Sequence, residues 1–319
     1  MARKKILVNY YGWWGGCYFK PFVPDDFLRM HPYLEDKYEL VLSDKPQVSL
    51  CSVYADGHVL PPEAPRGVAG IYHLIPKDSI KVLYTLEVGV PCIGMFDYYL
   101  SNSENTPDGI ANDRHFNIPA WSVYLRWQSA DRFRAIVKKP DESSSWDRPE
   151  FCCIVFSNYM AEFRIRFFEK LMKYKFVHCP GNLVRHGYVN TPIIRTLEGE
   201  THSESKRRYL RQFKFNICFE NTSVPGYTSE KIVDAMMSRT MPIYWGDPNI
   251  GKHFNTKSFL FYPNYRDEQD LIEHIIELDN NKAKYDEMFR QPYLINDSLR
   301  PEIDDGACLS FFDRIFESI

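Results

Sequence analysis

A capped helix start with a lysine in its first turn is the part of this sequence best suited to bind an anion. Thr228 or Ser229 is a good N-cap, and Glu230 and Lys231 come directly after it. Backbone N–H groups at the start of a helix can bind an anion, and Lys231 adds a mobile cation beside them. These groups suit a diphosphate. The alternative is a purely structural cap, since the stretch lacks the Gly-rich signatures of phosphate loops.

The sequence around this cap indicates a strand, a loop and a helix. Residues 215–219 are a short apolar and aromatic run, Pro225 and Gly226 interrupt it, and apolar residues return at helical spacing from Ile232. Residues 241–245 predict the next strand, which closes a β-α-β unit. The cap therefore lies in the connection between a strand and its crossover helix.

Two other residues follow predicted strands and could take part in chemistry. Glu87 comes just after a strand at 81–85, in a loop that contains Gly and Pro, where a carboxylate could act as a general base. Arg185 follows a strand and turn that begin at residue 176, and its planar fork can bind phosphate oxygens in a bidentate way. The alternatives are a loop glutamate and a surface arginine without a role.

The charge of the chain limits the partners it could bind. A net charge of -3 argues against a nucleic-acid partner held by bulk electrostatics. A local basic cluster could still serve a phosphate ligand, with a solvated helix face as the alternative. The residues of this cluster are Lys206, Arg207, Arg208, Arg211 and Lys214.

An aromatic loop follows the first predicted strand at residues 5–8. It contains Trp13 and Trp14 between glycines. Open α/β sheets bind ligands beyond the carboxyl ends of their strands, and sugars stack on exposed indole rings. The two tryptophans are therefore either a ligand lip or a hydrophobic lid over a core.

The longest pattern in the sequence resembles the donor-binding signature of the α-1,3/4-fucosyltransferases of glycosyltransferase family 10. It comprises Phe-Glu-Asn-Thr at 219–222, Tyr-Thr-Ser-Glu-Lys at 227–231 and Met-Pro-Ile-Tyr-Trp-Gly at 241–246. Thr228 and Ser229 depart from the usual aliphatic residue and threonine, but both retain capping chemistry. A Tyr-Thr-x-Glu segment that ends at Glu87, shortly before a Phe-Asp-Tyr, is similar to the bacterial members.

The resemblance assigns roles to individual residues. It implies that Glu87 is the catalytic base, with Asp97 and Glu104 as weaker rivals. It implies that the donor is bound by Arg185, Asn221, Tyr227, Glu230 and Lys231. Two cations beside the diphosphate, and the lack of an Asp-x-Asp motif at a strand end, imply that no divalent metal and no cofactor is essential.

The resemblance also implies a reaction. L-fucose would move with inversion from GDP-β-L-fucose to the GlcNAc or glucose of a lactosamine-type acceptor such as N-acetyllactosamine or lactose. This reaction belongs to the synthesis of Lewis-type glycans or of a lipopolysaccharide O-antigen. The alternatives are transfer from another nucleotide sugar and a glycan-binding module without activity.

Length and composition indicate two domains. The chain has 319 residues, of which 44% are hydrophobic, and alternating strands and helices predict an α/β protein. A charged and serine-rich stretch at 138–148 has the composition of a linker. We therefore expect an N-terminal acceptor-binding domain at 1–145 and a C-terminal GDP-fucose-binding domain, with the C-terminal helices, at 146–319. The resemblance implies the GT-B fold, in which two Rossmann-like parallel-sheet domains face a cleft.

The cysteines and the N-terminus favour the cytoplasm. The eight cysteines form no CxxC pair, which argues against a zinc site and a redox motif, and a reducing compartment is the simpler expectation. The apolar run at the N-terminus is too short for a signal peptide. Residues 307–319 predict an amphipathic helix that packs on the body of the protein. Peripheral contact of this helix with the inner membrane face stays open as the alternative.

Overall fold

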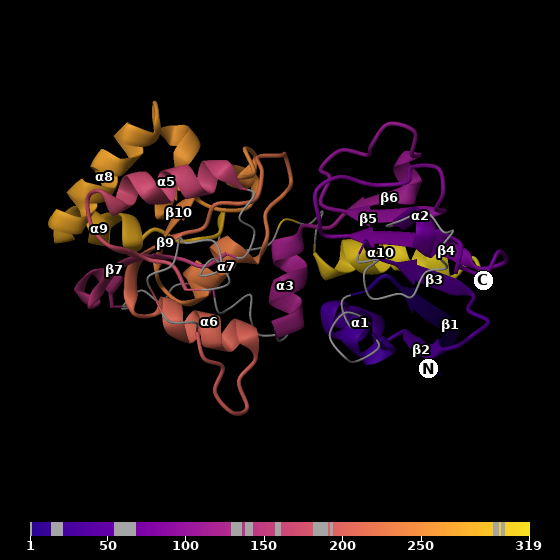
Figure 1. Cartoon of the computed structure of the whole chain (residues 1–319). Coiled ribbons are helices and arrows are strands. Elements are labelled where there is room, and N and C mark those ends of the chain that lie inside the picture. The colour runs from indigo at the N-terminus through magenta and orange to yellow at the C-terminus, as the bar shows by residue number, and fades with distance from the viewer. Residues whose placement is uncertain are drawn as a thin grey trace. The chain divides into compact units, whose positions relative to one another are not determined.

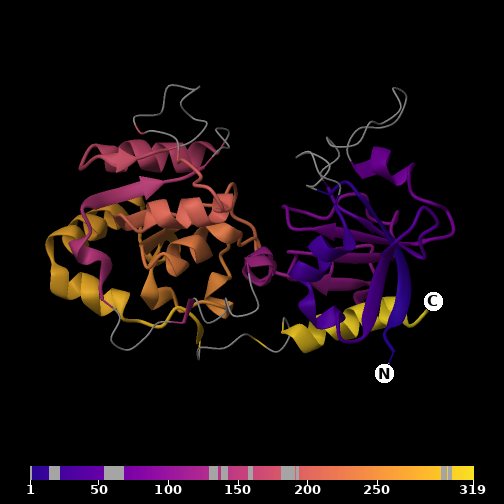
Figure 2. The same ribbon diagram turned by 90° about the horizontal axis from the view of Figure 1, so that it is seen from below.

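The chain forms two compact units in the computed structural model. The first comprises Met1–Arg132 with Arg300–Ile319, and the second comprises Phe133–Leu299. Each unit is built around one parallel β-sheet with helices packed on it (Figures 1 and 2). The structure describes residues 2–13, 22–53, 68–128, 136–137, 143–156, 161–180, 191, 194–295, 300 and 304–319.

The first unit contains a six-stranded sheet with the order β2-β1-β3-β4-β5-β6, and all neighbouring strands are parallel. The strands are β1 (Lys4–Tyr11), β2 (Tyr38–Leu42), β3 (Val48–Cys51), β4 (Ile80–Thr85), β5 (Tyr98–Ser101) and β6 (His115–Asn117). Strands β1 and β4 confirm the strands expected at 5–8 and 81–85. The polar stretch that follows β5 leads to the edge strand β6.

Side chains alternate between the two faces of this sheet, as the strand geometry requires. On one face, Val82 and Tyr84 of β4 join the core that contains helix α1 (Pro24–Met30) and the last helix, α10 (Asp305–Phe316). On the other face, Leu83 packs with residues of α2 (Val68–Tyr72). A third helix, α3 (Ala120–Gln128), contributes Val123 to the first core.

The last helix belongs to the first unit. This corrects the expectation that the C-terminal domain, at 146–319, includes the C-terminal helices. Phe312 has no exposed surface and packs against Phe27 of α1 and His31, with ring centroids 5.7 and 5.2 Å apart. Tyr38 of β2 donates a hydrogen bond to Asp313 at 2.6 Å. In both views the yellow helix α10 lies among the indigo and purple elements of the first unit (Figures 1 and 2). The apolar face of α10, which sequence periodicity showed, therefore covers the N-terminal sheet.

Trp13 is a core residue and not part of a ligand lip. Its ring is 2% exposed and stacks on Phe22 with a centroid distance of 4.5 Å. The indole N–H donates a hydrogen bond to the backbone oxygen of Leu50 at 2.8 Å, so its polar atom is satisfied inside the unit. Trp14 lies outside the described residues.

The second unit contains a five-stranded parallel sheet with the order β11-β10-β9-β7-β8. The strands are β7 (Glu150–Ile154), β8 (Val177–His178), β9 (Phe213–Ile217), β10 (Met241–Tyr244) and β11 (Leu260–Phe261). Strands β9 and β10 are neighbours, joined by helix α7 (Glu230–Met237). This arrangement confirms the predicted strand, loop, helix and strand around the helix cap.

Helices cover both faces of the second sheet. One face packs on α5 (Glu162–Met172), α8 (Glu268–Asn280) and α9 (Lys282–Phe289), for example through Phe167 and Leu271. The other face holds Cys153, which packs with Leu210 of α6 (His202–Leu210). No helix in the described ranges combines the length and apolarity needed to cross a bilayer.

Replacement of Phe312 by alanine should destabilise the first unit. Loss of a fully buried ring leaves a cavity and costs about 3–5 kcal/mol. Hydrogen exchange followed by mass spectrometry should then show faster exchange in β1, β2 and α1, while β9 and α7 keep their protection. Leu309→Ala, on a partly buried position of the same helix, is the control and should have a smaller effect. Faster exchange in the second unit alone would contradict the assignment of α10.

Candidate functional site

A buried carboxylate stands between β9 and α7. Glu220 has no exposed surface. Its Oε1 accepts a hydrogen bond from the backbone N–H of Ser229, and its Oε2 accepts one from Lys231 Nζ, each at 2.8 Å. The hydroxyl of Ser229, the N-cap of α7, lies 2.9 and 2.8 Å from the two carboxylate oxygens. Glu220 thus fixes the start of α7 to the end of β9.

Lys231 is a fixed cation, so the expectation of a mobile one was wrong. Its side chain is 16% exposed, and Nζ donates to Glu220 Oε2 and to Ser229 Oγ, each at 2.8 Å. Burial by itself lowers the pKa of this amine, but the carboxylates of Glu220 and Glu230 raise it above its ordinary value. An ammonium group has three N–H donors, so these two bonds leave one for a ligand oxygen.

A second buried carboxylate holds the loop that leads to the cap. Asp247 follows β10 and accepts hydrogen bonds from the backbone N–H of Gly226 at 3.0 Å and from Thr228 Oγ1 at 3.1 Å. Ser223 Oγ donates to the backbone oxygen of Gly246 at 2.6 Å. Loop 221–229 is therefore held by side chains at the ends of both neighbouring strands.

Arg164, in the first turn of α5, orients the amide of Asn221. Its side chain is buried, and Nη2 donates to Asn221 Oδ1 at 2.8 Å. Because the amide oxygen is occupied, Asn221 can offer its NH2 group to a ligand. Arg164 Nε is buried and has no hydrogen-bond partner among the described residues. Arg164 Nε, at the start of α5, and the NH2 group of Asn221, after β9, are thus two donors that can bind a ligand.

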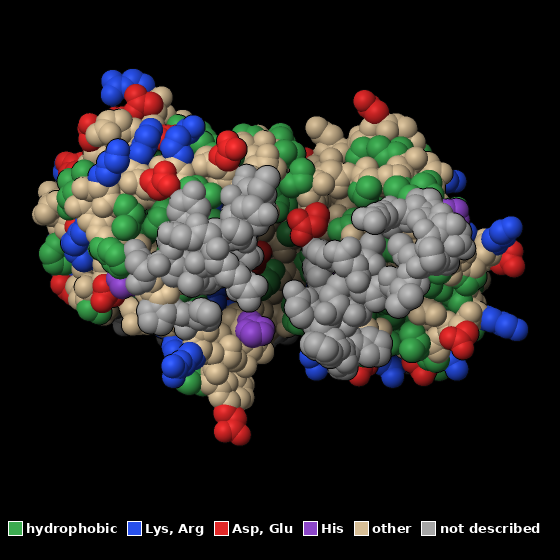
Figure 3. All heavy atoms as spheres, in the orientation of Figure 1, with side chains coloured by type: hydrophobic (Ala, Val, Ile, Leu, Met, Phe, Trp, Pro, Cys, Tyr) green, Lys and Arg blue, Asp and Glu red, His purple; other side chains and the backbone are tan. Residues whose placement is uncertain are grey.

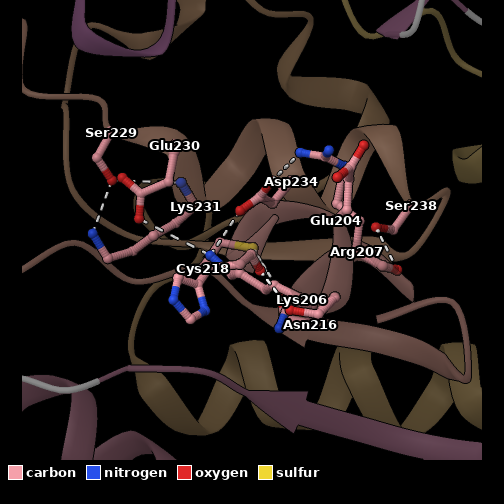
Figure 4. Close-up of polar contacts among 12 residues, drawn as sticks. Glu204, Lys206, Arg207, Asn216, Cys218, Ser229, Glu230, Lys231, Asp234 and Ser238 are labelled. Carbon is pink, nitrogen blue, oxygen red and sulfur yellow. Dashed lines mark hydrogen bonds and ion pairs between the residues drawn. The ribbon is translucent and has the colours of Figure 1, made fainter. Parts of the chain in front are cut away.

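Glu230 stands beside two lysines at the start of α7. Burial by itself raises the pKa of its carboxyl, but Lys231, Lys206 and hydrogen bonds of the helix start lower that pKa to about 2. Lys206 Nζ lies 2.8 Å from Asp234 Oδ2 and 4.0 Å from Glu230 Oε1. Figure 4 shows Ser229, Glu230 and Lys231 together at the helix start, with Lys206 and Asp234 beside them. The Glu230 side chain is 40% exposed, so its ionised carboxylate can accept hydrogen bonds from ligand hydroxyls.

The basic cluster is not an open phosphate patch. Lys206 and Arg207 both pair with Asp234, at 2.8 and 3.4 Å. Arg208 pairs with Glu200 at 2.8 Å, and Lys214 pairs with Asp279 at 2.9 Å. In Figure 3 acidic and basic side chains likewise lie interspersed on the face shown. Neither the phosphate patch nor the solvated helix face expected as its alternative describes these four residues, because each of them is held in an ion pair within the unit.

In the first unit, Glu87 lies exposed just beyond the carboxyl end of β4. Its backbone N–H donates to Thr85 Oγ1 at 3.2 Å. Asp97, the first rival, lies at the opposite end of the same strand, where its Oδ2 accepts a hydrogen bond from the backbone N–H of Lys81 at 2.8 Å. Glu104 follows β5 at the same edge as Glu87. Geometry therefore separates Asp97, but not Glu104, from Glu87.

For two of the predicted donor residues, Arg185 and Tyr227, a contact with the donor stays a prediction. Arg185 lies outside the described residues. The ring of Tyr227 is buried, and its backbone N–H donates to Val224 at 3.1 Å, so its contact with a sugar stays a prediction.

Within the described ranges, no group of three or more His, Cys, Asp and Glu side chains could hold a metal ion. Independence from a metal also stays a prediction.

A family model matches the part of the chain that carries this site. Residues 146–301 match the C-terminal part of glycosyltransferase family 10 (fucosyltransferase). These residues are a family 10 glycosyltransferase domain. The match includes Glu220, Asn221, Glu230 and Lys231, which confirms the family that the signature predicted.

Curated relatives extend the similarity over the whole chain. An α-(1,3)-fucosyltransferase of Helicobacter pylori is 27% identical over 96% of this chain and 65% of its own length. A putative fucosyltransferase of Acanthamoeba polyphaga mimivirus is 31% identical over 47% of this chain and 25% of its own. An α-(1,3)-fucosyltransferase of Drosophila melanogaster is 26% identical over 54% and 40%. The chain thus spans less than two thirds of the length of each of these relatives.

Solved structures confirm the fold class. The crystal structure of an α1,3-fucosyltransferase matches with a TM-score of 0.74 and 25% identity, over 99% of this chain and 92% of that one. An α1,3-fucosyltransferase solved with GDP-fucose matches with a TM-score of 0.72 and 23% identity. The α/β fold with two parallel sheets is therefore the predicted GT-B fold.

Sequence reasoning missed the residues that hold the family 10 site together. Glu220 and Asp247 were not given roles, although each acidic residue follows shortly after an apolar strand, where a solvated loop carboxylate was the ordinary expectation. The signal that the sequence offered is Gly246, which directly precedes Asp247. A glycine just after a strand indicates that another group packs closely against the backbone, and here that group is Glu220. Arg164 carries no such signal, because one sequence does not show whether a helix arginine is buried.

Replacement of Gly246 by alanine should disturb the site through Glu220. A Cβ at this position would overlap Glu220 Cγ and lie 2.8 Å from both Glu220 Cβ and Tyr244 Oη. Such overpacking costs about 1–3 kcal/mol. Hydrogen exchange should show faster opening at residues 220–231. Gly251→Ala is the matched control, because its Cβ would lie at an ordinary 3.5 Å from Thr256. Equal effects of the two substitutions would refute the close approach of Glu220.

Proposed function

We propose that this chain is an inverting α-1,3-fucosyltransferase, or an α-1,3/4 one, that uses GDP-β-L-fucose. The acceptor hydroxyl belongs to GlcNAc or glucose in a lactosamine-type sugar such as N-acetyllactosamine or lactose. The product would be a Lewis-type glycan or part of a lipopolysaccharide O-antigen. The observation that carries the proposal is the Glu220–Ser229–Lys231 cluster at the start of α7, inside a family 10 domain. The similarity to fucosyltransferases over 96% of the chain supports it.

The second unit provides the groups that the donor diphosphate needs. Negative charge grows on GDP as the bond to fucose breaks, and preorganised donors lower the barrier when they point at that charge. Lys231, the NH2 group of Asn221 and the helix start are held in place by buried neighbours. In this proposal Arg185 completes the cation pair, and Glu230 and Tyr227 bind the ribose or fucose. A second cation makes a divalent metal unnecessary, so transfer should persist in the presence of a chelator.

The first unit provides the base. A single displacement with inversion needs a group that takes the proton of the attacking hydroxyl, as in inverting glycosidases. Glu87 is exposed at the carboxyl end of β4, and its backbone is held by Thr85. In the proposed reaction its carboxylate receives the acceptor proton.

A panel of donors and acceptors tests the function as a whole. GDP-fucose should give a fucosylated product with lactose, N-acetyllactosamine or lacto-N-biose, and linkage analysis of the product fixes regioselectivity. Faster release of another nucleotide from its sugar donor would identify a GT-B transferase with a different donor. Glycan binding without turnover of any donor would identify a binding module.

Replacement of Glu87 by glutamine should lower transfer about 10²- to 10⁴-fold, because the amide cannot accept a proton. GDP affinity, measured by calorimetry, should stay unchanged, since the donor groups lie in the second unit. Glu104→Gln and Asp97→Asn are the controls and should retain activity. Near-normal turnover of Glu87→Gln would remove this residue from the mechanism.

Replacement of Lys231 by alanine should weaken GDP binding. The single variant also leaves Glu220 without its cation, which destabilises the unit. The double variant Lys231→Ala/Glu220→Gln removes that buried charge and should recover stability but not GDP affinity. If the double variant bound GDP normally, Lys231 would serve only to neutralise Glu220. Arg185→Ala should also weaken GDP binding, and exposed Lys257→Ala is the control that should not.

A further inference from the structure

The backbone of Glu87 is held by side chains on both sides. Its N–H donates to Thr85 Oγ1 at 3.2 Å, as part of a turn directly after β4. Asn102 Nδ2 donates a hydrogen bond to the carbonyl oxygen of Leu86 and another, at 3.4 Å, to the carbonyl oxygen of Glu87. Because Glu87 lies beyond the end of β4, these side-chain contacts take the place that hydrogen bonds between neighbouring strands have inside the sheet.

Asn102 connects this loop to the rest of the unit. Its side-chain oxygen accepts a hydrogen bond from the backbone N–H of Ala120, the first residue of α3, at 2.8 Å. Its own backbone oxygen accepts one from Asn117 Nδ2 at 3.0 Å. The residue is 4% exposed, so each of these polar groups needs its partner. One buried amide therefore joins the end of β4 to the start of α3.

The far end of the loop is fixed as well. Tyr99 Oη accepts hydrogen bonds from the backbone N–H groups of Gly94 at 2.8 Å and Phe96 at 3.1 Å. Between these anchors, Gly89 and Cys92 adopt positive φ values of 82° and 56°, which turn the chain sharply. The loop from Leu86 to Phe96 is thus tied at both ends to β5 and the residue after it.

We propose that Asn102 is a positioning residue for Glu87. It does not touch the reacting atoms. By holding the carbonyl groups of Leu86 and Glu87 against α3, it sets the place from which the Glu87 carboxylate meets the acceptor hydroxyl. The inference rests on the proposed function, in which Glu87 is the base. Proton transfer depends steeply on the placement of the base, so a loop that moves by about 1 Å loses much of the rate.

Asn102→Asp is the sharpest test, because it keeps the size of the side chain and the acceptor for Ala120. It replaces the donating NH2 group by an oxygen that repels the carbonyl oxygens of Leu86 and Glu87. The kcat of fucose transfer from GDP-fucose to N-acetyllactosamine should fall about 10- to 100-fold. The KM for GDP-fucose and the Kd for GDP should stay within about twofold of the unsubstituted protein, because the donor groups are untouched. Asn105→Asp is the matched control, since it adds the same charge at an exposed position of the neighbouring loop.

Two results would overturn the positioning role. One is a kcat within about twofold of the unsubstituted protein. The other is a fall in kcat matched by an equal loss of folded first unit, measured by hydrogen exchange in β4 and β5, which indicates unfolding only. If Asn102→Asp does not fold, Asn102→Ser is judged by the same two criteria. The Glu87→Gln variant separates the two proposals: full activity there refutes the base itself, whereas an inactive Glu87→Gln with normal Asn102 variants refutes only the positioning role.

Discussion

The ion pair between Glu220 and Lys231 is the interaction on which the site in the second unit depends. Charges are stable inside a protein only when they are paired and hydrogen-bonded, and here Ser229 completes both sets of bonds. The pair fixes the lysine but also compensates its charge. An anion that binds here is therefore selected by the direction of N–H donors more than by net positive charge, which is consistent with a chain of charge -3.

Both units use the same device at the carboxyl ends of their strands. In each, a buried polar side chain shortly after a strand, Glu220 and Asp247 in one and Asn102 in the other, binds backbone groups of the loop that carries the candidate residues. These side chains are held in place by the sheet. Their hydrogen bonds in turn fix a loop whose backbone lies outside the sheet. Of the residues proposed to meet the ligand, Glu87 lies two positions after the end of β4, and Lys231 lies fourteen positions after the end of β9.

Sequence patterns predicted the elements well and the partners of side chains poorly. Strand and helix periodicity located β4, β9, α7 and β10, because apolar spacing is a local property. The burial of Trp13, the pairing of Lys206 with Asp234 and the fixed position of Lys231 depend on contacts between elements, which one sequence does not display. The family signature identified Lys231 and Asn221 but is silent on what orients them. That information resides in Glu220 and Arg164, whose burial only the folded chain reveals.

The return of α10 to the first unit means that the core of this unit is closed by contacts of long sequence separation. Phe312 and Phe316 fill the core that holds Tyr38 and Phe27, and Arg126 pairs with Asp305 across 179 positions of sequence. The first sheet therefore has one face incompletely covered until the last residues of the chain are available, whereas the second unit is continuous from 133 to 299. Contacts of such long sequence separation form late, because the entropy of closing the loop must be overcome first. The second unit, which carries the donor residues, can thus complete its core before the unit that carries Glu87.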